Sequence, residues 1–368
     1  MNIKICKKCI TPNSRPRIVF DKNGICNACL NSENKKKINW KDRKKQFEKL
    51  VSDIKKFKKK SKYHCVVPWS GGKDSTSIAL KLKFDYGLEP LLVTFSPLVK
   101  NDIGDFNRQI LINQGFDSIF FSPDGKIAKL LSRRFFVERG NPKVAWDAGI
   151  NSLPVKVAIK YKIPFIFYAE HGESEYGGLV LNEQSNMIRN KEEVYEHQIG
   201  DYPENWISEQ ITQSDLEPYI YPENQNEEIT AYYFSYFFKW DMYENYLFVK
   251  KKLPSFKTVE RTEGTFTNFD SLDDKIDSLY YYMQYIKFGF GRSIRDASRM
   301  IQNGHITREK GLEHVLKYDD ELPEKYLKEN LEYLDLTELD FEEIVNKHRN
   351  IEVWEPSGNN WKKKFNII

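Results

Sequence analysis

Six consecutive residues, Ser-Gly-Gly-Lys-Asp-Ser at 70–75, combine the side chains and the backbone freedom that a phosphate site needs. The glycine pair lacks Cβ atoms, so the backbone can turn sharply and approach an anion closely. Apolar residues at helical spacing follow, and the unpaired N–H groups at the start of that helix would point at the anion. The lysine adds a positive charge. The aspartate indicates Mg²⁺, because a carboxylate beside a phosphate needs a cation between them. The predicted phosphate-binding residues are Ser70, Gly71, Gly72, Lys73, Asp74 and Ser75.

This loop is not a Walker A motif, which has the pattern G-x-x-x-x-G-K-[ST]. It resembles, residue for residue, the PP-loop of the ATP pyrophosphatases. In that superfamily the loop holds the β,γ-pyrophosphate of ATP, and AMP is transferred to an acceptor oxygen. The resemblance implies that this chain binds ATP and Mg²⁺, that Lys73 and Asp74 act in catalysis, and that Asp74 holds the magnesium.

Four of the five cysteines form two Cys-x-x-Cys pairs with sixteen residues between them. This spacing is typical of a zinc ribbon, in which four thiolates complete a tetrahedral site with no open position. Such a site stabilises a small fold that has almost no core of its own. An iron–sulfur cluster is the main alternative. We predict a structural Zn²⁺ site at Cys6, Cys9, Cys26 and Cys29, and a buried apolar role for Cys65.

A second group of polar residues, Glu-His-Gly-Glu-Ser-Glu-Tyr at 170–176, follows an apolar run that is typical of a strand. Three carboxylates so close together repel one another unless they share a positive partner. A metal ion, or the hydroxyl and amino groups of a substrate, would supply it, and a hydrated acidic loop is the alternative. The predicted substrate-binding residues are Glu170, Glu173, Glu175 and Tyr176.

Strand and helix patterns alternate from residue 63 onward. We expect strands at 64–69, 90–96, 117–122 and 164–170, and helices at 75–87, 103–114, 125–138 and 152–162. Pro154 is tolerated only in the first turn of the last helix. The alternation predicts a parallel sheet with right-handed crossovers and a ligand at the carboxyl ends of its strands. That edge would bring together the loop at 70–75, the acidic group at 170–176 and Thr94, which is therefore expected to contact the nucleotide.

The length of 368 residues leaves room for two or three domains. The predicted fold class is α/β, with a parallel-sheet PP-loop domain like that of the adenine nucleotide alpha hydrolases, an N-terminal zinc ribbon and a helical C-terminal region. The predicted divisions are a zinc-ribbon module at 1–33, a basic helical connector at 34–62, the α/β core at 63–180, an insertion or lid at 181–255, and a helical region that completes the active site at 256–368.

The net charge of +4 is unevenly distributed, since residues 35–62 hold fourteen Lys or Arg against three acidic residues. A nucleic-acid-binding helix would explain this charge. Apolar residues near helical spacing favour an amphipathic connector instead, so nucleic acid is not an expected partner. No apolar run is long enough to span a membrane and the first residues do not look like a signal peptide, so we expect a cytoplasmic protein with no membrane contact.

Several segments, in their order, resemble the N-acetyl sugar amidotransferases of bacterial surface-polysaccharide and flagellar-glycan pathways. The resemblance rests on the cysteine pairs before the loop, "AGINSLPVKVAIKYKIPFIFY" at 148–168 followed by "AEHGESEYGG" at 169–178, "YFFKWD" at 236–241, "EGTFTNFDSLDDKIDSLYYYMQYIKFGFGR" at 263–292 and "GHITREKGLEHVLKYD" at 304–319. It implies an enzyme that turns the acetamido group of a sugar into an acetamidino group. The sugar would be a uronic acid or a nonulosonic acid, such as pseudaminic or legionaminic acid, destined for lipopolysaccharide or flagellar glycan. We expect Lys275 and Arg292 to reach the phosphates from the helical region.

The expected chemistry needs ammonia. An amide carbonyl is a poor electrophile, and transfer of AMP to its oxygen creates a group that ammonia can displace. Glutamine hydrolysis needs a cysteine nucleophile, and we expect none here, because four cysteines are assigned to zinc, Cys65 lies in a strand and the second residue is Asn2. The resemblance implies a separate glutaminase subunit similar to that of imidazole glycerol phosphate synthase, with its barrel-shaped, cyclase-like companion.

A transfer-RNA-thiolating enzyme is the alternative function. Such enzymes adenylate a base carbonyl oxygen and can also carry cysteine pairs, and the basic segment would then contact RNA. They usually need further cysteines to deliver sulfur, and only Cys65 is left for that task. The sequence therefore favours a sugar acceptor.

Overall fold

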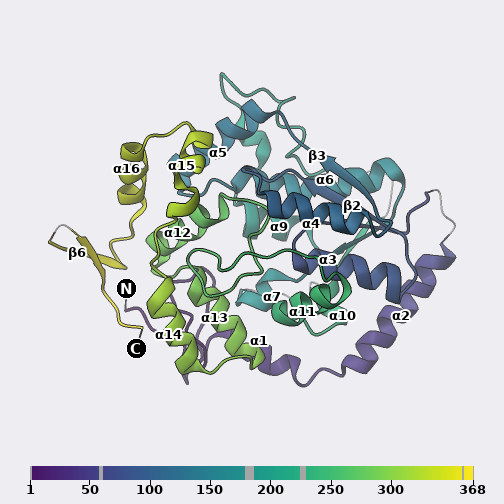
Figure 1. Cartoon of the computed structure of the whole chain (residues 1–368), viewed down its shortest axis with the longest axis horizontal. Helices are drawn as coiled ribbons and strands as arrows, with labels where there is room; N and C mark the ends of the chain where they lie inside the picture. Colours follow the sequence, from purple (N-terminus) through teal and green to yellow (C-terminus); the bar gives the residue numbers. More distant parts are fainter. Residues whose placement is uncertain (1, 58–60, 179–185, 224–228, 359, 368) are drawn as a thin grey trace.

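The computed structural model describes residues 2–57, 61–178, 186–223, 229–358 and 360–367. A five-stranded parallel sheet lies at its centre, with the strand order β3-β2-β1-β4-β5 (Figure 1). The strands are β1 (Cys65–Pro68), β2 (Pro90–Phe95), β3 (Asp117–Phe121), β4 (Phe165–Tyr168) and β5 (Thr230–Tyr233). The first four lie inside the ranges expected from the sequence, so the prediction of an α/β fold with a parallel sheet is confirmed.

The fifth strand was not expected. β5 pairs in parallel with β4 over four residues, from Phe165 opposite Thr230 to Tyr168 opposite Tyr233. It comes from segment 181–255, which the sequence predicts to be an insertion or lid. A strand this short carries too little alternation to be recognised, and its pairing with the neighbouring strand β4 decides its conformation. The expected boundary between residues 180 and 181 lies outside the described residues.

Helices cover both faces of the sheet, and alternate residues of the strands point to each side. Val66, Leu91 and Val93 pack against α5 (Gly125–Arg139) and α6 (Val144–Tyr161). Cys65, Val67 and Leu92 face the other way. Their cover consists of α2 (Trp40–Lys56), α3 (Lys73–Leu80) with its π-helical continuation η1 (Lys81–Asp85), α4 (Asp102–Ile112) and α11 (Met242–Lys252).

Helix α6 corrects one expectation. It begins at Val144, so Pro154 lies in the interior of the helix and not in its first turn. Proline has no N–H to donate to the carbonyl of Ile150. Both residues line the cavity described below, so the interruption of the helical hydrogen-bond pattern lies on the wall of the candidate site.

The C-terminal region is helical, as expected, and ends in a hairpin. Its elements are α12 (Asp277–Phe288), α13 (Arg292–Asn303), α14 (Arg308–Tyr318), α15 (Glu324–Leu334), α16 (Glu338–His348), β6 (Trp354–Ser357) and β7 (Asn360–Lys363). Helices α12, α15 and α16 share an apolar cluster with Phe136 of α5, while α13 and α14 enclose Ile10 near the N-terminus. Figure 1 shows the purple N-terminal chain passing behind α13 and α14.

Short elements complete the description: α7 (Gly172–Tyr176), α9 (Lys191–Val194), η2 (Tyr195–Ile199), η3 (Pro203–Trp206) and α10 (Phe234–Phe237). None of the described helices combines the length and the apolar character that a membrane span requires.

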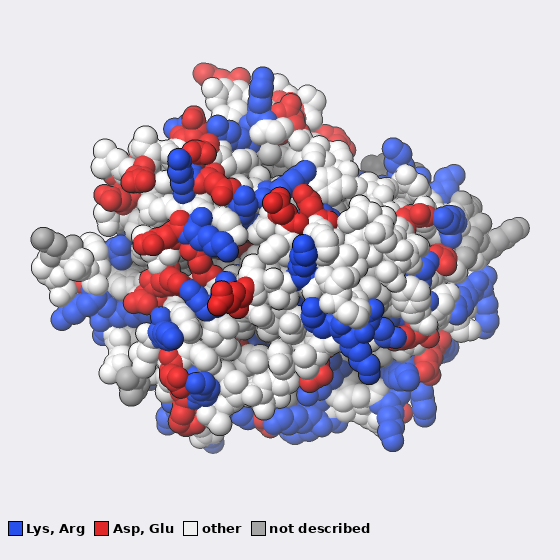
Figure 2. Space-filling view, in the orientation of Figure 1, with Lys and Arg blue, Asp and Glu red and all other residues white. Residues whose placement is uncertain are grey.

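The basic segment at 35–62 contains the last residue of α1 (Asn27–Lys35) and the whole of α2. Phe47, Val51 and Ile54 on one face of α2 are buried in the core, as an amphipathic helix requires. Many of its lysines lie on the solvent side, and Figure 2 shows blue side chains gathered along this edge of the molecule. Residues 58–60 of the predicted connector lie outside the described residues.

Candidate functional site

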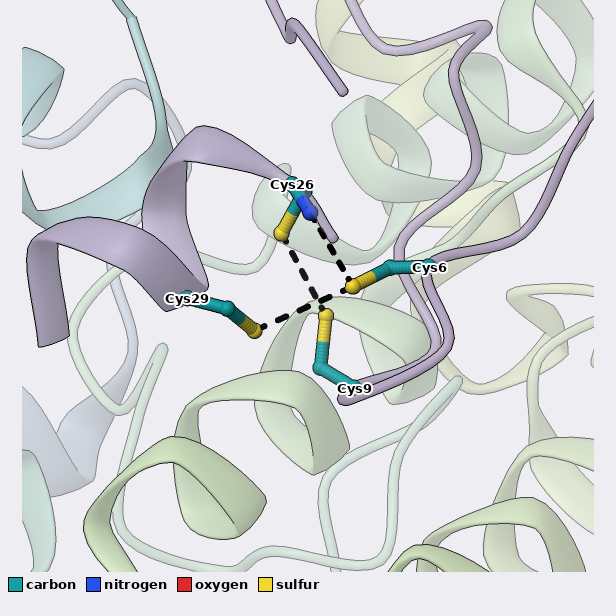
Figure 3. Close-up of side chains that lie close together, drawn as sticks. All are labelled: Cys6, Cys9, Cys26 and Cys29. Atoms are coloured by element: carbon teal, nitrogen blue, oxygen red, sulfur yellow. Dashed lines mark hydrogen bonds between the residues drawn. The ribbon is translucent and has the colours of Figure 1, made fainter. Parts of the chain in front are cut away.

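Four cysteines form a closed cluster at the N-terminus (Figure 3). Cys6, Cys9, Cys26 and Cys29 are fully buried, and their sulfur atoms all lie within 4.8 Å of one another. Two of the separations are 3.7 Å, between Cys9 and Cys26, and 3.9 Å, between Cys6 and Cys29. A tetrahedral Zn²⁺ with Zn–S bonds of about 2.3 Å places its sulfur ligands about 3.8 Å apart. The cluster therefore fits a single zinc ion with four protein ligands.

This N-terminal cysteine module also contacts the acidic segment 170–178. Arg15 donates a hydrogen bond to the carbonyl of Gly177 at 2.9 Å, Asn27 to that of Gly178 at 3.2 Å, and Asn31 to that of Ser174 at 3.3 Å. On α13, Ser298 accepts a hydrogen bond from the Thr11 hydroxyl at 3.0 Å. The cysteine module thus supports two segments that lie close to the candidate site.

A cavity of about 520 Å³ opens at the carboxyl ends of β1, β2 and β4. The strand order reverses between β1 and β4, and in open α/β sheets ligands bind outside the strand ends at this point. The two segments predicted from the sequence, 70–75 and 170–176, follow β1 and β4. Tertiary structure therefore brings both to one cavity, which α6, α12 and α13 close from the other sides.

The loop after β1 has the geometry of an anion site. Gly71 has φ +95°, and a Cβ there would lie 2.8 Å from the Arg108 side chain, so glycine is required at this position. Helix α3 begins after Gly72 without a side-chain cap, which leaves the N–H groups of its first turn available to a ligand. Arg108 fixes the turn from α4 by donating to the carbonyl of Ser70 at 2.7 Å.

Lys73 is almost fully buried and forms ion pairs with two carboxylates. Its ammonium lies 2.8 Å from Asp74, and its second partner is Asp270, from the segment before α12. Burial opposes the charge, but Asp270 and then Asp74 outweigh it and raise the pKa of Lys73 above its ordinary value. Asn245 of α11 holds the other oxygen of Asp74 at 2.9 Å. The lysine is therefore charged and fixed in position.

Asp270 connects this loop to the arginines of α13. Arg295 pairs with it at 2.9 Å and Arg292 at 3.8 Å, and Arg292, Arg295 and Arg299 share one face of the helix. Two donor atoms of Arg292, Nε and Nη2, are buried without a hydrogen-bond partner among the described residues. Buried donors of this kind are costly unless a ligand completes them. Nη2 lies 3.8 Å from Asp270 and Nε lies 3.6 Å from Asp296, so Arg292 lines the cavity with its charge held between two carboxylates.

The acidic segment divides in two. Glu170 lines the cavity and accepts a hydrogen bond from Tyr176 at 2.8 Å, and burial followed by the charge of Asp74 raises its pKa. Glu173 pairs with Arg17 at 2.7 Å, and Glu175 pairs with Lys35 and with Arg299, the latter at 3.2 Å. Glu173 and Glu175 do not line the cavity, because they turn toward cations of the cysteine module and α13. Their predicted position beside the substrate is not what the structure shows.

Two residues predicted to contact the nucleotide also lie elsewhere. Thr94 is buried within β2, where its hydroxyl donates to the carbonyl of Trp69. Lys275 pairs with Glu329 of α15 outside the cavity. Thr94 does not reach the cavity because it still belongs to β2, where its side chain packs within the sheet. Lys275 points away because Ile276 and Asp274, its neighbours, occupy the buried positions.

Several cavity residues were missed by the sequence analysis: Trp146, Asn151, Arg189, Asp270, Tyr281 and Arg295. The arginines had a readable signal, since positions 292, 295 and 299 recur at the spacing of one helix face. Arg189 and Asn151 had none, because neither the type of residue nor its spacing distinguishes them from the polar residues beside them. The predicted residues that do line the cavity are Ser70, Gly72, Lys73, Asp74, Ser75, Glu170, Tyr176 and Arg292.

Comparison with known proteins adds an independent finding. Residues 263–366 match the family model described as the C-terminal domain of LPS biosynthesis protein WbpG-like proteins. An uncharacterised protein of Methanocaldococcus jannaschii is 34% identical over 89 residues, which cover 24% of this chain and 31% of that protein. The match thus spans about a third of the relative's length. The family match includes Asp270, Tyr281 and the arginines of α13, and it supports a place for this chain among proteins of surface-sugar biosynthesis.

Proposed function

We propose that this chain is an ATP-dependent amidotransferase that converts the acetamido group of an N-acetylated sugar into an acetamidino group, with release of AMP and pyrophosphate. One observation carries the proposal. The phosphate-type loop at 70–75 faces Arg292 and Arg295 across a single cavity, and these arginines lie in the segment that matches a lipopolysaccharide-biosynthesis family. An anion site and a sugar-pathway segment therefore share one binding space.

The loop and α13 would hold the pyrophosphate part of ATP between them. The open N-terminus of α3, the ammonium of Lys73 and the guanidinium of Arg292 are the groups suited to its oxygens. Asp74 is the residue that would hold Mg²⁺, which neutralises phosphate charge when it is bound. Among the described residues, no cluster of three metal-binding groups other than the cysteines is present. This fits magnesium, which uses one or two carboxylates together with phosphates and water.

The proposed reaction has two steps. The acetamido oxygen attacks the α-phosphorus, the bond to the β-phosphate oxygen breaks, and pyrophosphate leaves with the electron pair. Ammonia then adds to the imidate carbon, AMP leaves with the C–O electron pair, and loss of a proton gives the amidine. Lys73 and Arg292 would stabilise the charge on the leaving pyrophosphate. Glu170, whose pKa is raised, is placed to accept a proton from the adding ammonia.

Ammonia would come from a separate glutaminase subunit of the kind found in imidazole glycerol phosphate synthase, with its barrel-shaped, cyclase-like companion. The five cysteines of this chain support a separate source of ammonia. Four cysteines form the metal cluster, and Cys65 is fully buried within β1, where burial raises the pKa of its thiol. A buried, protonated thiol is a poor nucleophile for glutamine hydrolysis. The same burial weakens the alternative of a transfer-RNA-thiolating enzyme, which needs an accessible sulfur carrier.

The test is incubation of the chain with ATP, Mg²⁺, an ammonium salt and a panel of N-acetylated sugars, read by mass spectrometry. The expected product is lighter than its acceptor by the difference between an oxygen atom and an NH group, and AMP forms in equal amount. Reactions without ammonium, or without sugar, are the controls. Absence of AMP with every acceptor, or transfer of AMP to an RNA base, would refute the proposal.

A further inference from the structure

Arg189 is a cation of the central cavity that the scheme above does not use. It lies between the end of the acidic segment and α9, and its guanidinium carbon is 4.1 Å from the centre of the Tyr168 ring, at the end of β4. Its Nη2 donates to the side-chain oxygens of Asn151 and of Gln198, the latter at 3.1 Å. Its Nη1 lies 3.4 Å from the hydroxyl of Tyr233. All these partners are neutral.

Within the described residues, the positive charge of Arg189 therefore has no paired negative charge. Among the described residues Arg189 takes part in no ion pair with a carboxylate, whereas Lys73, Arg292 and Arg295 each pair with at least one. The Nε atom of Arg189 is buried and has no hydrogen-bond partner among the residues that the structure describes. A guanidinium cannot release its proton, so the cost of this partly buried charge persists until an anion arrives.

The neighbours of Arg189 hold it in one orientation. Asn151 donates to Gln198 at 3.0 Å and to the carbonyl of Asp147 at 2.7 Å, which turns both amide oxygens toward the guanidinium. Tyr168 supports the flat face of the group. Asn151 and Gln198 line the same cavity as Lys73. A fixed guanidinium with a free donor is suited to the paired oxygens of a carboxylate or a phosphate.

We propose that Arg189 binds an oxyanion carried by the acceptor and thereby sets which acceptors the site takes. The identity of the acceptor as a sugar rests on the function proposed above. The phosphates of ATP have their own donors in the loop at 70–75 and in Arg292, so the charge of Arg189 is left for the second ligand. The oxyanion is either a carboxylate on the sugar or a phosphate that links the sugar to a nucleotide.

The experiment compares the chain with its Arg189→Gln and Arg189→Lys variants. Three acceptors are used: an N-acetylated sugar with a free carboxylate, the matching neutral N-acetylhexosamine, and that neutral sugar linked to a nucleoside diphosphate. Loss of one charged hydrogen bond should raise KM for the recognised acceptor about 10–100-fold in Arg189→Gln, with less effect in Arg189→Lys. KM for ATP and turnover of the neutral sugar should not change.

The outcome also identifies the oxyanion. An effect confined to the sugar acid assigns a carboxylate, and an effect confined to the nucleotide-linked sugar assigns a phosphate. An equal effect on all three acceptors, or an effect on ATP alone, would overturn the proposal. Arg133→Gln, which removes a surface arginine paired with Asp335 at 2.9 Å, is the matched control and should behave like the unaltered chain.

A binding measurement separates this inference from the proposed reaction. Calorimetric titration of the same three compounds, without ATP, needs no turnover. Binding of an anionic compound that is lost in Arg189→Gln and kept in Arg133→Gln supports the inference even if no acceptor is converted. Equal binding by the chain and by Arg189→Gln contradicts it even if the amidine forms. Thermal unfolding of each variant shows whether the fold is retained.

Discussion

Lys73 and Asp270 form an ion pair at the side of the cavity that carries the loop at 70–75. Both side chains are held by further partners, Asp74 on one side and Arg295 on the other. A charge fixed in this way needs little reorganisation when a phosphate arrives, which is the basis of electrostatic catalysis. Removal of one such preorganised charge is therefore expected to lower the rate of pyrophosphate release more than the affinity for ATP.

Lys73→Met should lower pyrophosphate release from ATP by about 10²–10³-fold, because one preorganised charge at the leaving group is lost. Far-UV circular dichroism and thermal unfolding establish that the variant is folded. Lys275→Met is the matched control, since that lysine pairs with Glu329 outside the cavity and should leave the rate near normal. Equal rates for the two variants would show that the loop at 70–75 is not the phosphate site.

Asp147 on α6 gives a pH-dependent prediction. Burial raises the pKa of its carboxyl to about 7, Lys143 acts in the opposite direction, and Asp277 adds to the increase. The unfolded pKa is about 3.9, so between these values the folded state holds a proton that the unfolded state has lost. The contribution of this carboxyl to the free energy of unfolding is therefore complete at low pH and is lost as the pH rises toward about 7.

Asp147→Asn removes this dependence. The free energy of unfolding of the variant minus that of the unaltered chain should increase by about 1–3 kcal/mol from pH 5 to pH 8, since each pKa unit corresponds to about 1.4 kcal/mol. Urea unfolding of both proteins at the two pH values measures the difference. If the difference between variant and unaltered chain is the same at pH 5 and pH 8, the carboxyl does not titrate in this range.

At the scale of elements, the contact between α6 and β2 sets one wall of the cavity. Gly149 of α6 lies directly over Phe95, and a Cβ at this position would be 2.4 Å from the ring. Phe95 and Ile150, the next residue of α6, both line the cavity. The close approach of helix and strand therefore depends on the absence of a single side chain.

Gly149→Ala should destabilise the protein by about 1–3 kcal/mol, because the added methyl group overpacks the core. Gly125→Ala, in the preceding helix α5, is the comparison. No atom lies within 4 Å of a Cβ there, so this change should be neutral or stabilise by about 0.4–1 kcal/mol. Thermal unfolding of the two variants measures both effects, and a stable Gly149→Ala protein would show that α6 moves freely against the sheet.

At the scale of the whole molecule, the cysteine module and the central cavity are joined through α7 and α13. Removal of the metal should therefore reduce the stability of segments outside the module as well. Cys26→Ser should lose the single zinc equivalent and speed hydrogen exchange in residues 172–178 as well as in the module. Cys65→Ser, which alters a cysteine outside the cluster, should keep its zinc and its protection. Unchanged exchange at 172–178 after metal loss would show that the two parts are independent.

The nitrogen source is a second prediction at this scale. The chain should form product with ammonium salts and fail with glutamine, because no accessible thiol is present in the described structure. Addition of a glutaminase of the imidazole glycerol phosphate synthase type should restore the use of glutamine. Glutamine-dependent product formation by the purified chain alone would mean that one of its cysteines has been wrongly assigned.

The sequence by itself determined the local features. Residue types and spacing predicted the anion loop, the four-cysteine site and four of the five strands. The loop and the strands depend on glycine backbone freedom and on short apolar runs, and each half of the cysteine site is a local Cys-x-x-Cys pair. The buried four-cysteine cluster and the parallel sheet confirm the second and third of these predictions, and phosphate binding by the loop stays a prediction.

Tertiary structure alone decided which charges face the ligand. Glu170, Glu173 and Glu175 are equivalent by sequence, yet only Glu170 lines the cavity, because Arg17, Lys35 and Arg299 from distant segments take the other two. Lys275 pairs with Glu329, and Arg189 pairs with no carboxylate among the residues that the structure describes, for the same reason. The energy of a buried charge depends on its partners in space, and a sequence without its fold does not state them.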